Sequence, residues 1–253
     1  AAAARADALL APAAREFAQS CGLPRPGGSL VSGLPGSGKT SLLSSLPGEA
    51  SRRCRFPVAG VYVHCAALVG EAAKAVRARL AAACEEAVAR APSLLLLDDI
   101  DALFPASQEE SGGGREGTGD PSHGLAAWLA EALQSASAAV WSGRGACGPW
   151  PVAVAASCGE PAALAPELRA AACLDFDVQL RPPGTEERAD ILASALQARH
   201  LTDPGGHLAA GLSRIDGCDA ADLGVLADRA RLEAARRHLS QGGTAGDAAA
   251  AGA

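Results

Sequence analysis

Eight residues in the first part of the chain, Gly33 to Thr40, read G-L-P-G-S-G-K-T and match the phosphate-binding pattern G-x-x-x-x-G-K-[ST] in full. Glycines at positions 33, 36 and 38 let successive backbone N–H groups curl around a phosphate without obstruction by side chains. Lys39 can reach the β- and γ-phosphates, and the Thr40 hydroxyl is placed to bind Mg²⁺ at a helix N-terminus, where the dipole favours anions. The motif predicts a nucleotide site formed by Leu34, Pro35, Gly36, Ser37, Gly38, Lys39, Thr40 and Ser41.

An acidic sequence later in the chain, S-L-L-L-L-D-D-I-D from Ser93 to Asp101, supplies the second half of such a site. Four leucines are too few to span a membrane and suit a central parallel strand that is covered on both faces. Asp98 is predicted to hold Mg²⁺ through water, and Asp99 to polarise the attacking water, where such ATPases usually carry glutamate. Because the side chain of Asp99 is one methylene shorter than that of glutamate, it could slow hydrolysis without harming nucleotide binding. An ordinary acidic loop is the alternative for Asp99 and the preferred interpretation for Asp101.

The composition limits the classes of protein and of partner. With 253 residues and 49% apolar side chains, the chain can bury a full core and suits one α/β module with a small accessory subdomain. Aromatic residues make up 3%, and the net charge is −6, so nucleic acid is not expected as a partner. No stretch approaches 18 apolar residues. Methionine is absent, even at position 1, and we therefore expect the sequence to be a segment of a longer protein.

Cysteine and histidine show no pattern typical of a metal site. The eight cysteines contain no C-x-x-C pair and no histidine at metal-ligand spacing, which favours reduced thiols in a cytosolic protein. The five histidines are isolated in the sequence and are interpreted as surface or core residues.

Strand and helix patterns alternate along the first 180 residues. Short apolar strands are predicted at 29–31, 58–63, 94–97, 151–156 and 174–180. A helix is predicted at about 71–90, ended by Pro92, and a Gly-rich surface loop at 109–121. The alternation predicts an α/β fold of the P-loop NTPase type, with a parallel sheet flanked by helices.

After Gly184 the strand pattern stops and helical signals take over. Thr185 and Asp219 are predicted N-caps, and Leu223, Leu226, Ala227 and Ala230 share one face of the second helix. The predicted organisation is a lead-in helix and linker at 1–28, a P-loop α/β subdomain at 29–183, a small helical lid at 184–240, and a low-complexity tail at 241–253.

Three sequences together resemble the ATPase domain of the AAA family: the P-loop, the acidic strand, and Gly217 to Leu223. The last reads G-C-D-A-A-D-L and resembles the family signature G-F-S-G-A-D-L. The resemblance runs from about Leu30 to Leu239 and implies ATP and Mg²⁺ as cofactors. It also implies a hexameric ring with nucleotide between neighbouring subunits, an arginine supplied in trans, and Ala221 beside the nucleotide.

Two details are similar to the first ATPase domains of the peroxisome-biogenesis branch of this family. One is the Asp-Asp ending of the acidic strand, and the other is V-H-C-A-A-L from Val63 to Leu68, before a long helix. The resemblance implies a hetero-hexameric ring with sister AAA subunits that recycles the ubiquitinated import receptor from the peroxisomal membrane. The chain would then be cytosolic and held peripherally at that membrane through a partner.

Departures from the family pattern predict an ATPase with weak turnover. Cys158 stands where the family usually carries a water-orienting asparagine, and thiol is a poor group for that task. Arg169 could be the arginine supplied in trans or a solvated surface charge, and Cys173 falls near the position of a second one. No aromatic pore residue occurs around 68–70. A fully active unfolding ATPase of another cytosolic pathway and a nucleotide-free interaction module are the alternatives.

Overall fold

The structure is a computed structural model that describes residues 20–21, 27–106, 121–141, 152–170, 172–201 and 215–240. It divides into two compact units, of which the first comprises Ala1–Gly33 and Lys39–Leu180 and the second comprises Leu34–Gly38 and Arg181–Ala253. The predicted tail and most of the predicted lead-in and loop lie outside the described residues. Pro121, predicted as the end of that loop, instead begins a helix.

A parallel sheet forms the centre of the first unit, as the alternating pattern predicted. Its strands are β1 (Ser29–Gly33), β2 (Ala59–His64), β3 (Ser93–Asp98), β4 (Val152–Cys158) and β5 (Phe176–Leu180). They lie in the order β2-β3-β4-β1-β5, and every pairing is parallel. Parallel neighbours require crossover connections, which the intervening helices supply.

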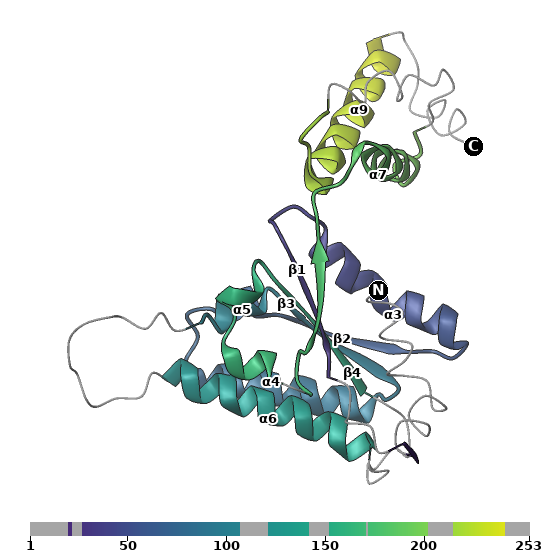
Figure 1. Cartoon of the computed structure of the whole chain (residues 1–253). Helices are drawn as coiled ribbons and strands as arrows, with labels where there is room; N and C mark the ends of the chain where they lie inside the picture. Colours follow the sequence, from purple (N-terminus) through teal and green to yellow (C-terminus); the bar gives the residue numbers. More distant parts are fainter. Residues whose placement is uncertain are drawn as a thin grey trace, which may run out of the picture. The chain divides into compact units, whose positions relative to one another are not determined.

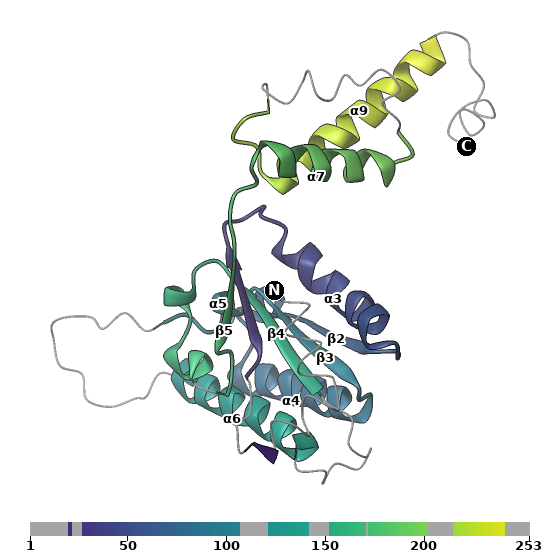
Figure 2. The same cartoon turned by 45° about the vertical axis from the view of Figure 1, so that its right-hand side comes forward.

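Helices cover both faces of this sheet, and the leucines of β3 show why (Figures 1 and 2). Successive strand residues point to opposite faces, so Leu94 and Leu96 pack in the core under α3 (Lys39–Cys54). Leu95 and Leu97 belong to the larger core on the other face, under α4 (Ala73–Ala89) and α6 (Pro121–Trp141). All four leucines are buried, which accounts for the continuous apolar run.

Besides α3, the described part of the first unit contains α4, α6 and the short helix α5 (Ile100–Leu103). Three short 3₁₀ helices span Cys65–Leu68, Pro161–Ala163 and Pro166–Arg169. The helix predicted at 71–90 is confirmed with slightly shorter bounds, and Pro92 follows it before β3. Gly60 on β2 allows close approach of α3, because a Cβ there would lie 2.9 Å from Pro47 Cγ.

In the second unit, α7 (Thr185–Gln197) packs against α9 (Ala220–Ser240). The cap of α7 differs from the prediction: Gly184 is the N-cap, and its N–H donates to Glu187 Oε2 at 2.7 Å. Asp219 does cap α9, with Oδ1 accepting from the Asp222 N–H at 2.8 Å. The four residues predicted to share one face all lie on α9, but they differ in burial. Leu223 and Ala227 are buried, whereas Leu226 and Ala230 are exposed.

Two features of the described part of the chain bear on its environment. None of its helices is long and apolar enough to cross a membrane. Its cysteines are free thiols at positions 21, 54, 65, 84, 158, 173 and 218.

Candidate nucleotide and metal site

The carboxyl ends of β1, β3 and β4 meet at one edge of the sheet, because these strands are parallel and nearly in register. Ser32 pairs with Cys158, and Leu97 pairs with Ala156. Asp98 therefore ends β3 beside Ser157. In open α/β sheets, ligands bind outside the carboxyl ends of the strands.

The phosphate-binding sequence has the backbone that its glycines predicted. Gly36 and Gly38 have φ of +80° and +92°, which side-chain-bearing residues rarely adopt. A Cβ on Gly36 would also collide with the carboxylate of Asp219, which belongs to the same unit. The buried Ser37 Oγ has no hydrogen-bond partner among the described residues. An open backbone cradle with an unpaired hydroxyl fits a phosphate ligand.

Lys39 and Thr40 begin α3 and point their functional atoms in two directions. Lys39 Nζ donates to the Gly33 carbonyl at 2.8 Å, so the ammonium folds back along the end of β1. Thr40 Oγ1 donates to Asp98 Oδ2 at 2.9 Å. Ser41 is exposed on the first turn of the helix, as are Leu34 and Pro35 in the preceding loop.

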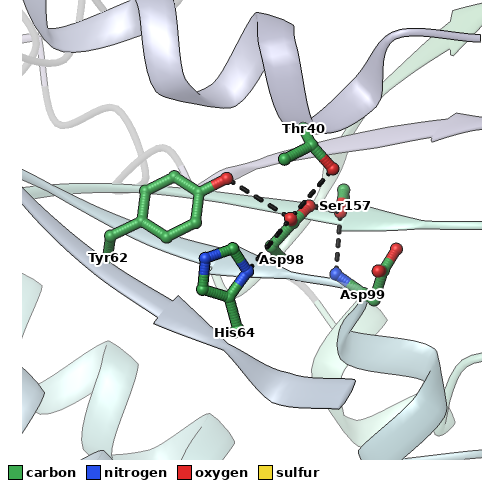
Figure 3. A network of polar contacts seen from close by, with 6 residues as sticks. All are labelled: Thr40, Tyr62, His64, Asp98, Asp99 and Ser157. Atoms are coloured by element: carbon green, nitrogen blue, oxygen red, sulfur yellow. Dashed lines mark hydrogen bonds and ion pairs between the residues drawn. The ribbon is translucent and has the colours of Figure 1, made fainter. Parts of the chain in front are cut away.

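Asp98 is the centre of a polar network, which Figure 3 shows from close by. Asp98 is buried, with 2% of its surface exposed. Oδ2 accepts from Thr40 and, at 3.3 Å, from the Tyr62 hydroxyl, and it lies 3.5 Å from His64 Nδ1. Oδ1 accepts from Ser157 Oγ at 2.6 Å. A threonine hydroxyl and an aspartate oxygen are the hard donors that Mg²⁺ prefers, so Thr40 and Asp98 fit the predicted ion.

Tyr62 acts in this network only as a donor. Burial, followed by the negative charge of Asp98, raises the pKa of its phenol to about 12. The hydroxyl is therefore protonated at neutral pH and can hold Asp98 without competing for a cation.

Asp99 follows directly and turns the chain from β3 into α5. It is the N-cap residue of α5, with φ 53° and ψ 51°, a left-handed conformation that few non-glycine residues adopt. Its N–H donates to Ser157 Oγ at 2.8 Å. Burial, followed by the charge of Asp98, raises the pKa of its carboxyl group. Asp101, interpreted as an ordinary loop acid, has a specific structural contact, because Oδ2 accepts from the Gly159 N–H at 2.8 Å.

The other predicted site residues lie as follows. Cys158 ends β4 and is fully buried, and burial raises the pKa of its thiol to about 12. Arg169 is exposed at the end of a 3₁₀ helix, whereas Cys173 lies in the core and is 3% exposed. Ala221 belongs to the second unit, where its N–H donates to the Gly36 carbonyl at 3.2 Å.

Sequence reasoning missed Ser157, Tyr62 and His64. The interpretation of His64 as an isolated histidine was incomplete, because His64 pairs directly with Asp98 in the register of β2 and β3. Aligning the ends of the two predicted strands would have suggested this neighbour. The double role of Ser157 depends on the turn at Asp99, which no local sequence pattern indicates.

Comparison with known proteins places this fold in a family. Residues 29–182 match the model of the family "ATPase family associated with various cellular activities (AAA)". The chain is similar to Protein SAV of Sulfolobus acidocaldarius, with 29% identity over 89% of the chain and 26% of that protein. It is 30% identical to Cell division control protein 48 homolog B of Arabidopsis thaliana, over 87% of the chain and 34% of that protein.

A third relative is Peroxisomal ATPase PEX1 of Komagataella phaffii, which is 29% identical over 81% of the chain and 17% of that protein. The chain thus spans between 17% and 34% of the length of these relatives. Because the family match covers more than half of the sequence, the chain belongs to the AAA family of ATPases.

Proposed function

We propose that the chain is an ATP-binding AAA domain that binds Mg·ATP at the interfaces of an oligomeric ring and hydrolyses it slowly. The network at Asp98 carries the proposal. Thr40, the first-turn hydroxyl of α3, contacts Asp98 directly, and Lys39 lies next to it in a complete phosphate-binding motif. Bound Mg²⁺ would neutralise charge on the phosphates, while Thr40 and Asp98 hold the ion and Lys39 contacts the phosphate oxygens.

Three features support slow hydrolysis. Asp99, the candidate base, has a shorter side chain than glutamate, and its backbone is fixed at the N-cap of α5. The thiol of Cys158 is buried and protonated at neutral pH, so it is a poor group to orient water. Arg169 is the candidate for a trans arginine because it is exposed, whereas buried Cys173 supplies no second one. A trans arginine is worth about 10³ to 10⁵ in rate.

The proposed pathway is recycling of the matrix-protein import receptor at the peroxisomal membrane, with sister AAA subunits in a hetero-hexamer. Support comes from the relative named Peroxisomal ATPase PEX1 and from the Asp98-Asp99 and Val63 to Leu68 sequences. The alternative is a fully active unfolding ATPase of a cytosolic pathway, which the similarity to a Cell division control protein 48 homolog favours. In both cases bound ATP would stabilise the folded, assembled ring, because ATP binds that state.

The test is to incubate the chain with Mg·ATP, remove free nucleotide by gel filtration, and identify the retained nucleotide by ion-exchange chromatography. Retained ATP is the expected result. Retained ADP with released phosphate would favour the fully active alternative. Retention of no nucleotide would overturn both.

Lys39→Ala tests the phosphate contact. Losing a charge-assisted hydrogen bond worth about 1.5–3 kcal/mol should weaken ATP affinity roughly 10- to 100-fold by calorimetry. The matched control is Lys74→Ala, because Lys74 is the only other lysine of the sequence and is exposed on α4. Equal affinities of wild type and Lys39→Ala would contradict the proposed site.

A further inference from the structure

His64 belongs to the Asp98 network and has a metal-binding side chain, but neither the phosphate-binding motif nor the acidic strand explains its presence there. It ends β2, and its Nδ1 lies 3.5 Å from the same Asp98 oxygen that accepts from Thr40 at 2.9 Å. A hydroxyl oxygen and an imidazole nitrogen therefore both lie within 3.5 Å of one carboxylate oxygen (Figure 3). All three atoms are of types that ligate divalent ions. Each comes from the start or end of a different element.

The imidazole of His64 is oriented toward Asp98 and is not buried in the core. Its ring packs on Tyr62, with centroids 4.7 Å apart and the planes tilted by 54°, which turns Nδ1 toward Asp98. The side chain is 62% exposed, against 3% for that of Asp98. The imidazole is therefore accessible to a ligand that arrives from solvent at the end of the sheet.

The protein side chains alone do not complete a metal site. In the described part of the chain, no three His, Cys, Asp or Glu side chains gather closely enough to hold an ion by themselves. The ion must then arrive with ligands of its own, and the phosphates of a nucleotide supply them.

We propose that His64 is a nitrogen ligand of the nucleotide-bound divalent ion, and that it shifts the metal preference of this site from Mg²⁺ toward Mn²⁺ and Co²⁺. This inference rests on the proposed function, because it concerns the metal of the same nucleotide site. Mg²⁺ is a hard ion that strongly prefers oxygen ligands, whereas the affinity of sites with nitrogen ligands for first-row divalent ions rises from Mn²⁺ to Co²⁺. We therefore expect a small gain for Mn²⁺ and a larger one for Co²⁺. A site with oxygen ligands alone would favour Mn²⁺ or Co²⁺ over Mg²⁺ less than a site that also has a nitrogen ligand.

The size of the effect follows from the removal of one ligand. Changes around metal ligands typically cost about 10- to 100-fold in metal affinity. We expect the lower end for Mn²⁺, because phosphates, Thr40 and Asp98 remain. Affinity for Mg²⁺, which gains little from nitrogen, should change less than about threefold.

The experiment uses the whole chain with Mn²⁺ and a non-hydrolysable ATP analogue, studied by electron spin-echo envelope modulation. Protein labelled with ¹⁵N-histidine is compared with unlabelled protein, so that nitrogen of the nucleotide and of the backbone is not mistaken for imidazole. The variants are His64→Phe, which keeps a ring against Tyr62, and His200→Asn as control, since His200 is exposed in the other unit and has φ 58°.

The expected result is a histidine nitrogen coupling in wild type and His200→Asn that His64→Phe lacks. Mn²⁺ affinity, titrated by loss of the free-ion signal, should fall about tenfold in His64→Phe alone. Bound Mn²⁺·nucleotide without histidine coupling, or equal losses for Mn²⁺ and Mg²⁺, would overturn the inference and leave the nucleotide site standing. Failure of wild type to bind nucleotide with any metal would instead refute the proposed function.

Discussion

Replacing Ser157 with alanine should destabilise the chain more than the loss of a single hydroxyl suggests. Ser157 is fully buried on β4, and its one oxygen makes two contacts. It donates to Asp98 Oδ1 at 2.6 Å and accepts from the Asp99 N–H at 2.8 Å. Alanine would leave a carboxylate oxygen and a backbone donor without these partners at the end of the sheet.

The two contacts set the magnitude. A hydrogen bond to a charged group contributes about 1.5–3 kcal/mol, and an unsatisfied buried donor costs about 1–3 kcal/mol. The Asp99 N–H is only partly buried, so its share lies at the lower end. We expect Ser157→Ala to lower the free energy of unfolding by roughly 2–4 kcal/mol, a large fraction of the ~5–15 kcal/mol typical of a domain.

Urea unfolding followed by circular dichroism gives the measurement, with Ser32→Ala as the matched control. Ser32 is 2% exposed on neighbouring β1, but it makes one bond of 3.1 Å to Asp177, which is exposed and can be solvated in its place. The control should lose about 1 kcal/mol or less. The reasoning is refuted if the two variants lose equal stability, or if Ser157→Ala loses less than ~0.5 kcal/mol.

Two further predictions concern turnover and thiol chemistry. Asp99→Glu should raise steady-state phosphate release if the short side chain is the main defect, and an unchanged rate would shift the cause to Cys158 and the arginines. Burial raises the pKa of the Cys65 and Cys158 thiols to about 12. At pH 8 about one such thiol in 10⁴ is therefore ionised, whereas about one in ten would be ionised at the ordinary pKa of 9.0. In a mass-spectrometric time course with iodoacetamide, exposed Cys21 should therefore be modified long before either buried thiol, and rapid native modification of Cys158 would contradict its burial.

The sheet was predictable from the sequence because its signals are local and strong. The leucines of β3 are apolar on both faces, which is typical of a covered parallel strand, and glycines at 36 and 38 are required by positive φ. Pro92 marked the end of α4 in the same way. The α7 cap was missed because Gly184 has no side chain to recognise; the contact comes from Glu187 reaching back to its N–H.

The Asp98 network could be predicted only in part, since its partners are brought together by strand register. Thr40 and Asp98 follow from motifs, but His64 and Tyr62 reach Asp98 only because β2 pairs with β3. On β2, Tyr62 lies two residues before His64, so both point to the same face. Sequence patterns that describe one element at a time do not contain this information.

The residue proposed to hold a cation, Asp98, and the residue proposed to activate water, Asp99, differ in how many hydrogen bonds fix their carboxylates, and this difference favours binding over turnover. Every oxygen of Asp98 is fixed by a neighbouring element: Oδ1 by Ser157 and Oδ2 by Thr40 and Tyr62. Asp99 is fixed mainly through its backbone, and no hydrogen bond to its carboxylate is seen among the described residues. A base must be held within hydrogen-bonding reach of its water to work. Lengthening the side chain in Asp99→Glu changes reach but adds no such support, so the gain in turnover should stay well below the ~10³-fold or more that a trans arginine supplies.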